Sequence, residues 1–104
     1  MPQIAYTVTA TLPDKATSSE YVAWLLDGHV DAVLAGGAIR ANVVRIDRPA
    51  DPIRVQTCYV FPSQEALDDY TQDHAPSLQA DGLARFGPGR NVSFERTIGV
   101  ILKA

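Results

Sequence analysis

At 104 residues the chain has the length of a single domain, and its 46% hydrophobic and 20% charged residues are typical of a globular protein rather than a disordered one. Its net charge of −3 argues against a nucleic-acid partner, because binding phosphates needs clustered cations. No apolar stretch approaches the ~20 residues that a membrane span requires. The lone Cys58 cannot form an internal disulfide, so we expect a cytoplasmic protein with no membrane partner.

The first part of the chain predicts a strand followed by a helix. Residues 3–12, QIAYTVTATL, alternate between two faces and include many β-branched side chains, which is typical of a strand. Thr17-Ser-Ser-Glu20 has the spacing of a capping box, so we expect a helix to begin there. Gly36-Gly37 is predicted to end this helix, because glycine adopts a left-handed conformation without a Cβ penalty.

The next residues predict a hairpin, a second helix and a last strand. Residues 38–48 and 53–61 alternate again, and the RPADP sequence between them is typical of a turn. Ser63 is the expected N-cap of the second helix. Gly87-Pro88-Gly89 is predicted to end the helical region, and residues 91–102 form the expected last strand.

A His-Ala-Pro sequence interrupts the second helix at residues 74–76. The ring of Pro76 forbids a hydrogen bond to the carbonyl of Gln72 and disfavours a helical Ala75. We therefore expect the helix to bend near Ala75, or to restart with Pro76 as the first residue of a second segment.

The element order β-α-β-β-α-β over residues 1–104 predicts one α+β domain with the ferredoxin-like fold. In that fold a four-stranded antiparallel sheet carries two helices on one face. The opposite face of the sheet is expected to be small and apolar enough to form a two-fold homodimer. A monomer with a wet, threonine-rich face is the alternative. The residues expected on this outer face are Ala5, Thr7, Thr9, Thr11, Ile39, Ala41, Val43, Arg45, Cys58, Val60, Thr97 and Gly99.

The two histidines are the candidate catalytic residues. His29 follows Leu25 by four residues and His74 follows Tyr70 by four, so both rings are expected beside the helix faces that turn toward the sheet. They would then lie near a shared, mostly apolar cavity, which is the usual form of a small-molecule site. The alternative is that each histidine is structural and bonds a carbonyl or a carboxylate. The candidate walls of the cavity are Tyr6, Trp24, Tyr59 and Tyr70.

The sequence gives little support for a metal site or a covalent nucleophile, and we expect no cofactor. Neither His29 with Asp31 nor Asp73 with His74 has the i, i+4 spacing that turns two ligands to one side of a helix. Cys58 lies in the middle of a predicted strand, where an inert thiol is expected. No Gly-x-Ser-x-Gly sequence is present.

Three segments resemble a bacterial family known only as a domain of unknown function, within the dimeric α+β barrel superfamily. They are YVAWLLDGHVDAVLAGG at 21–37, YVFPSQEALDDYTQDHAPSLQADGLARFG at 59–87 and VSFERTIGV at 92–100. The resemblance implies a ferredoxin-like fold, a homodimer, and a ligand between helices and sheet. The most specific elements of the resemblance are Trp24, His29, Tyr70, His74, Ala75, Pro76 and Arg85-Phe86, and Arg85 joins the candidate ligand-binding residues on this ground.

The leading hypothesis for function is a homodimer that binds a small hydrophobic or aromatic molecule without catalysis. The superfamily also includes cofactor-free monooxygenases and isomerases. The second hypothesis is therefore such an enzyme, in which His29 or His74 moves a proton, because the unperturbed imidazole pKa of about 6.5 lies near working pH. A purely structural or interaction module is the third. The sequence does not decide whether the protein is an enzyme.

Overall fold

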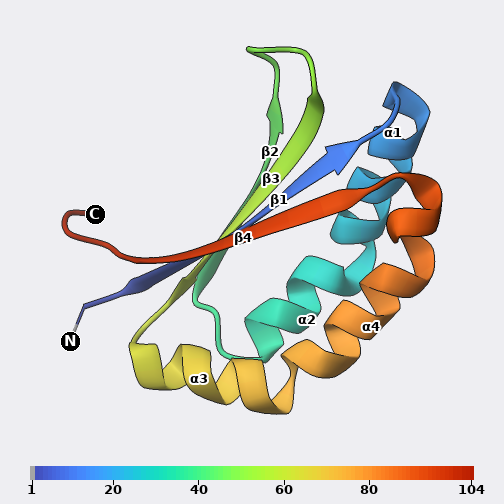
Figure 1. Cartoon of the computed structure of the whole chain (residues 1–104). Helices are drawn as coiled ribbons and strands as arrows, with labels where there is room; N and C mark the ends of the chain where they lie inside the picture. Colours follow the sequence, from blue (N-terminus) through green and yellow to red (C-terminus); the bar gives the residue numbers. More distant parts are fainter. Residues whose placement is uncertain (1) are drawn as a thin grey trace.

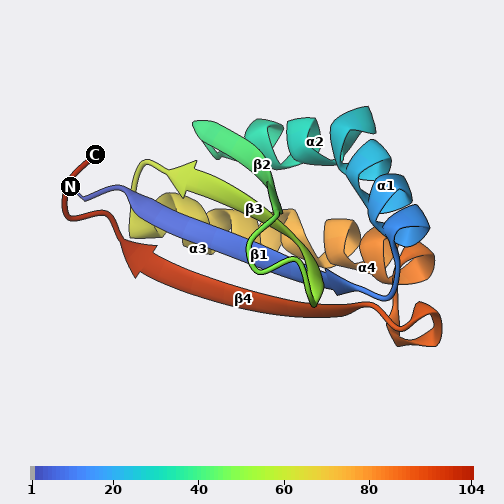
Figure 2. The same ribbon diagram turned by 90° about the horizontal axis from the view of Figure 1, so that it is seen from above.

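The computed structural model describes residues 2–104 and has the ferredoxin-like architecture that the sequence predicts (Figure 1). The strand order is β2-β3-β1-β4, and every neighbouring pair is antiparallel. Figures 1 and 2 show the helices together on one face of a strongly twisted sheet. No helix within residues 2–104 is long and apolar enough to cross a membrane. The elements are β1 (Ile4–Leu12), α1 (Lys15–Trp24), η1 (Leu25–His29), α2 (Val30–Ala35), β2 (Arg40–Ile46), β3 (Ile53–Phe61), α3 (Gln64–Asp73), α4 (Ala75–Arg85), η2 (Pro88–Arg90) and β4 (Ser93–Val100).

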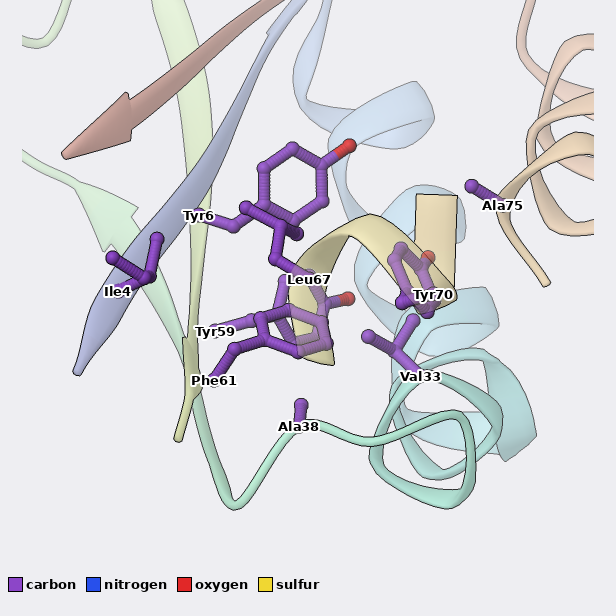
Figure 3. Packing of buried hydrophobic residues seen from close by; sticks show 9 residues of the cluster. All are labelled: Ile4, Tyr6, Val33, Ala38, Tyr59, Phe61, Leu67, Tyr70 and Ala75. Carbon is purple, nitrogen blue, oxygen red and sulfur yellow. The ribbon is translucent and has the colours of Figure 1, made fainter. Parts of the chain in front are cut away.

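The core lies between the helices and the inner face of the sheet. Its side chains alternate along β1 and β3, as period-two patterning requires, with Tyr6 opposite Tyr59 and Ile4 opposite Phe61. Two buried clusters divide the core, one toward α3 and one toward α1. Figure 3 shows the first of them, in which sheet and helix side chains meet. This cluster consists of Ile4, Tyr6, Val33, Ala38, Tyr59, Phe61, Leu67, Tyr70 and Ala75.

The first helix begins earlier than predicted. Asp14 is the N-cap of α1, and its side chain accepts a hydrogen bond from the backbone N–H of Thr17 at 2.7 Å. The capping box expected at Thr17-Ser-Ser-Glu20 was therefore wrong by three residues, because Thr17 is the residue whose amide is capped. An aspartate oxygen serves that purpose as well as a hydroxyl does.

The first helix is also interrupted, which the sequence analysis did not predict. Asp27 and Gly28 leave helical geometry inside the π-helical turn η1, and Gly28 has a φ of +108°. Glycine suits this position because it has no Cβ to clash at positive φ. The predicted stop at Gly36-Gly37 is confirmed, since Gly36 is the C-cap of α2 and Gly37 has a φ of +127°.

The break in the second helical region is confirmed. Ser63 is the N-cap of α3 and accepts a hydrogen bond from the backbone N–H of Ala66 at 3.1 Å. The helix ends at His74, and α4 restarts at Ala75 with Pro76 in its first turn. Proline fits there because the first N–H groups of a helix have no intrahelical partner.

One part of the predicted outer face is wrong. Pairing of β2 with β3 sets Asn42 opposite Cys58 and Ala41 opposite Tyr59. Asn42 and Val44 therefore share the outer face with Cys58, whereas Ala41, Val43 and Arg45 belong to the inner face. The period of two was read correctly for β2, but nothing in that strand's own sequence determined which of its faces is buried.

Candidate functional site

A cavity opens between the helices and the inner face of the sheet. The space in it that admits a water-sized sphere measures about 40 Å³, and its total free space, open solvent included, is about 510 Å³. Strands β1, β3 and β4 form the floor, and side chains from α1, η1, α2, α3 and α4 form the walls. All four tyrosines of the chain and its single tryptophan contribute to the lining. These five residues are Tyr6, Tyr21, Trp24, Tyr59 and Tyr70, and Phe94 also lines the cavity.

Tyr6 packs against both Tyr59 and Tyr70. The ring centroid of Tyr6 lies 6.1 Å from that of Tyr59 and 6.2 Å from that of Tyr70. Burial raises the pKa of Tyr70 to about 12, with a smaller contribution from neighbouring Tyr6 and a small opposing effect of Arg96. Burial also raises the pKa of Tyr59, and nearby tyrosines add to that effect. These phenols therefore offer neutral hydroxyl groups near neutral pH.

His29 lines the cavity and directly follows the interruption at Gly28. Its ring stacks on Trp24, with a centroid distance of 4.1 Å and an interplanar angle of 27°. Burial lowers the pKa of His29, and the nearby charge of Asp81 opposes this only in part. The Nδ1 atom of His29 is buried without a hydrogen-bond partner. A neutral imidazole with a free ring nitrogen can accept or donate a proton within a cavity.

Trp24 is held in place by α4. Its indole Nε1–H donates a hydrogen bond to Oδ2 of Asp81 at 3.3 Å. Gly82 lets the indole approach closely, because a Cβ at that position would lie 3.2 Å from the ring. Arg85 donates to Oδ1 of the same Asp81 at 3.3 Å. Arg85 therefore pairs at the surface with Asp81, the hydrogen-bond partner of Trp24, and does not line the cavity.

His74 lies away from the cavity. It is exposed at the junction of α3 and α4, and its ring lies nearly parallel to Tyr70 at a centroid distance of 6.3 Å. Its other neighbour is Gly36, where an added Cβ would approach the imidazole to 3.1 Å. The structure therefore brings His29 together with the predicted Tyr6, Trp24, Tyr59 and Tyr70, but not with His74 or Arg85.

Sequence reasoning missed three polar residues of the lining, Thr57, Gln79 and Arg96. Thr57 lies on the inner face of β3 opposite Val8, so the alternation of that strand could have identified it. Arg96 lies opposite Val8 on β4, and its Nε donates to the hydroxyl of Tyr6 at 3.2 Å. An arginine on the inner face of a strand was the available signal for it. Within the described residues, no group of three or more His, Cys, Asp or Glu side chains could hold a metal ion.

Several solved structures share this fold at low sequence identity. A dimeric ferredoxin-like protein from an uncultured marine organism superposes with a TM-score of 0.72 and 11% identity, covering 100% of this chain and 99% of that chain. SnoaB, a cofactor-independent oxygenase from Streptomyces nogalater, superposes with a TM-score of 0.69 and 10% identity, covering 100% of this chain and 97% of that chain. A monooxygenase from the gene ActVA-Orf6 of Streptomyces coelicolor, in complex with Nanaomycin D, superposes with a TM-score of 0.75 and 16% identity. The superposition covers 99% of this chain and 90% of that chain. These similarities establish the fold and no activity.

Comparison with curated proteins found no match to this chain. A family described as a domain of unknown function, DUF4286, matches residues 3–101. That match spans nearly the whole chain and confirms the family resemblance noted in three of its segments. The chain therefore belongs to the DUF4286 family.

Proposed function

We propose that this protein is a homodimer that binds a small aromatic molecule in the cavity between helices and sheet. The observation that carries this proposal is the gathering of every tyrosine and the single tryptophan around one hollow. Aromatic rings prefer offset or edge-on contact with other rings, and this lining offers several such faces to a flat guest. The Streptomyces coelicolor monooxygenase of the same fold is complexed with Nanaomycin D, which supports a ligand in this fold.

Binding requires the mouth of the cavity to open. The cavity volume of about 40 Å³ is far below the roughly 300 Å³ of an ordinary small-molecule site. Leu83 and Gln79 line the cavity from α4 and are both exposed, Leu83 by 55%. Exposed side chains change rotamer rapidly, so these two are the expected gate. A single aromatic ring would displace them and leave the packed floor of the sheet unchanged.

Trp24 provides a direct test, because it is the only tryptophan and it lines the cavity. Titration with p-cresol should quench its fluorescence saturably, whereas cyclohexanol should have little effect. Gly82→Leu should abolish the quenching, since its side chain would occupy the space beside the indole. Gly89→Leu is the matched control, because a Cβ there meets nothing within 4 Å. The absence of saturable quenching by p-cresol and by other single-ring aromatics would overturn the proposal.

A second candidate function, proton transfer at His29 without a cofactor, has one specific observation in its favour. His29 combines a lowered pKa with a buried, unpartnered Nδ1 in the cavity. Such a group could accept a proton from a bound hydroxyaromatic and leave an imidazolium beside the anion. If turnover of such a compound is found, His29→Gln should reduce kcat by about 100-fold or more. His74→Gln should leave it unchanged, and equal losses in both variants would contradict this role.

The outer face of the sheet is the proposed dimer interface. A structural neighbour from an uncultured marine organism is described as dimeric, which supports a dimer here. The outer-face side chains of β1, including Thr7 and Thr9, are small and half-buried although none of the described helices covers them. Cys58 lies on the same face of the sheet, opposite Thr7.

A further inference from the structure

Within residues 2–104, two polar atoms of the cavity lining are buried without a hydrogen-bond partner, the hydroxyl oxygen of Thr57 and Nδ1 of His29. Thr57 is only 1% exposed and sits in the floor of the cavity, opposite Val8 on β1 and Val43 on β2. Buried polar atoms in folded proteins are almost always paired, and an unpaired one calls for an explanation.

No structural use accounts for the Thr57 hydroxyl. Its neighbours across the sheet are valines, and a valine in its place would keep the same β-branched shape without leaving a polar atom unpaired. Elsewhere in the sheet, by contrast, the hydroxyl of Thr7 has a partner in the sulfur of Cys58 at 3.6 Å. Thr57 lines the cavity, so a molecule bound there is the available partner for this hydroxyl.

We infer that Thr57 and His29 form a polar anchor that recognises a hydroxyl group on the aromatic ligand, so that the ligand is a phenol rather than a hydrocarbon. This inference rests on the proposed binding function and specifies its ligand class. A hydroxyl fits both partners, because it donates one hydrogen bond and accepts others. It can therefore pair with the threonine hydroxyl and with either tautomer of the imidazole. The ligand enters with its oxygen first, and its ring lies among Tyr6, Tyr59 and Trp24.

Water is the competing occupant. The 40 Å³ of the cavity is enough for about three water molecules at roughly 10–15 Å³ each. The two explanations differ in what they predict for binding. A site satisfied by water gives a ligand no benefit from a hydroxyl group, whereas a polar anchor discriminates strongly against an analogue that lacks one.

The test compares p-cresol with p-xylene, in which a methyl group replaces the hydroxyl at nearly equal size. Dissociation constants come from calorimetry and from quenching of Trp24. We expect the wild-type protein to bind p-cresol at least about tenfold more tightly than p-xylene. Thr57→Val should remove or reverse this preference by weakening p-cresol alone, because an apolar floor favours the hydrocarbon. Thr57→Ser, which keeps the hydroxyl, should retain the preference for p-cresol. Thr71→Val, on exposed α3, is the matched control and should bind as the wild type does.

Thermal unfolding without ligand gives a second, independent readout. Thr57→Val should raise the melting temperature, because it removes an unpaired buried hydroxyl and keeps the packing. A structural hydroxyl would produce the opposite shift, and a Thr57→Val protein that melts earlier or fails to fold would overturn the inference. Equal binding of p-cresol and p-xylene by the wild type would assign the anchor to water and overturn the inference while the proposed function stands. Binding of neither compound would refute both.

Discussion

His29 is kept neutral by its surroundings and not by a hydrogen-bond partner. Burial against Trp24 disfavours the charged imidazolium and lowers the pKa, and Asp81 on α4 opposes this effect only in part. The indole N–H already occupies one oxygen of Asp81 and Arg85 the other. The carboxylate therefore holds the tryptophan in place, and the imidazole is left free to face the cavity.

The depressed pKa of His29 predicts a loss of stability in mild acid. In the unfolded chain the histidine takes up its proton near pH 6.5, whereas in the folded protein it does so only at lower pH. Between these values the unfolded state binds more protons, so the free energy of unfolding falls as the pH drops below about 6.5. Thermal melts of His74→Gln between pH 7.5 and 5, where His29 is the only histidine, should show this decline. The double variant His29→Gln/His74→Gln should show a shallower one, and identical slopes would contradict the assignment.

For single residues, the sequence indicated which residue types could form a site better than it indicated which way each side chain points. Alternation in β1 and β3 was enough to place Tyr6 and Tyr59 in the core, because a strand has only two faces. Helical spacing was not enough for His74, because Pro76 ends α3 there and turns the residue out to solvent. Thr57 was missed because a threonine in a strand is common, and its significance lies in the absence of a partner, which only the structure reveals.

Among the elements, the two helical regions are each broken, and the two breaks serve different purposes. The break at Pro76 lets α3 and α4 follow the twisted sheet, and it was predictable because proline lacks an amide hydrogen. The break at Asp27-Gly28 was not, because a lone glycine within a helical pattern is usually tolerated. His29, which lines the cavity, directly follows this second break, and such π-type irregularities are frequent at functional sites.

Gly28→Ala is expected to destabilise the protein through its backbone alone. A Cβ at Gly28 would meet nothing within 4 Å, so steric crowding is not the cause. The cost comes from the φ of +108°, which side-chain-bearing residues rarely adopt, and amounts to about 1–3 kcal/mol. Urea unfolding measures it. Gly89→Ala, with equal open space and no positive φ, should change stability by less than about 0.5 kcal/mol.

The binding consequence of Gly28→Ala separates backbone strain from a role in the site. If η1 relaxes toward a regular helix, the stacked pair of His29 and Trp24 shifts, and affinity for p-cresol should fall together with stability. Gly37→Ala, also at positive φ but at the end of α2, should lose stability without loss of affinity. Unchanged p-cresol binding in Gly28→Ala would show that the interruption does not position the site.

For the whole molecule, the sequence left open which side of β2 is buried. Val43 and Val44 are adjacent and equally apolar, so the strand's own pattern gives two equivalent registers. Pairing with β3 resolves the choice, because Val43 lies opposite the buried Thr57 and Val44 opposite Gln56. Val44 is left 43% exposed on the outer face. The fold class followed from element order alone, but the composition of this outer face depended on contacts between strands distant in sequence.

The outer face gives the last prediction, which concerns assembly. Thr7 lies near the middle of β1, between Cys58 on β3 and Thr97 on β4, at the centre of the proposed interface. A lysine there would bury an unpaired charge at the contact of two copies, at a cost of about 3–5 kcal/mol. Sedimentation equilibrium at micromolar concentration should give the mass of two chains for the wild type and of one chain for Thr7→Lys. Gln72→Lys, which adds the same charge on exposed α3, should remain a dimer. A wild-type mass of one chain, or a Thr7→Lys protein that still pairs, would show that the outer face is not where two copies meet.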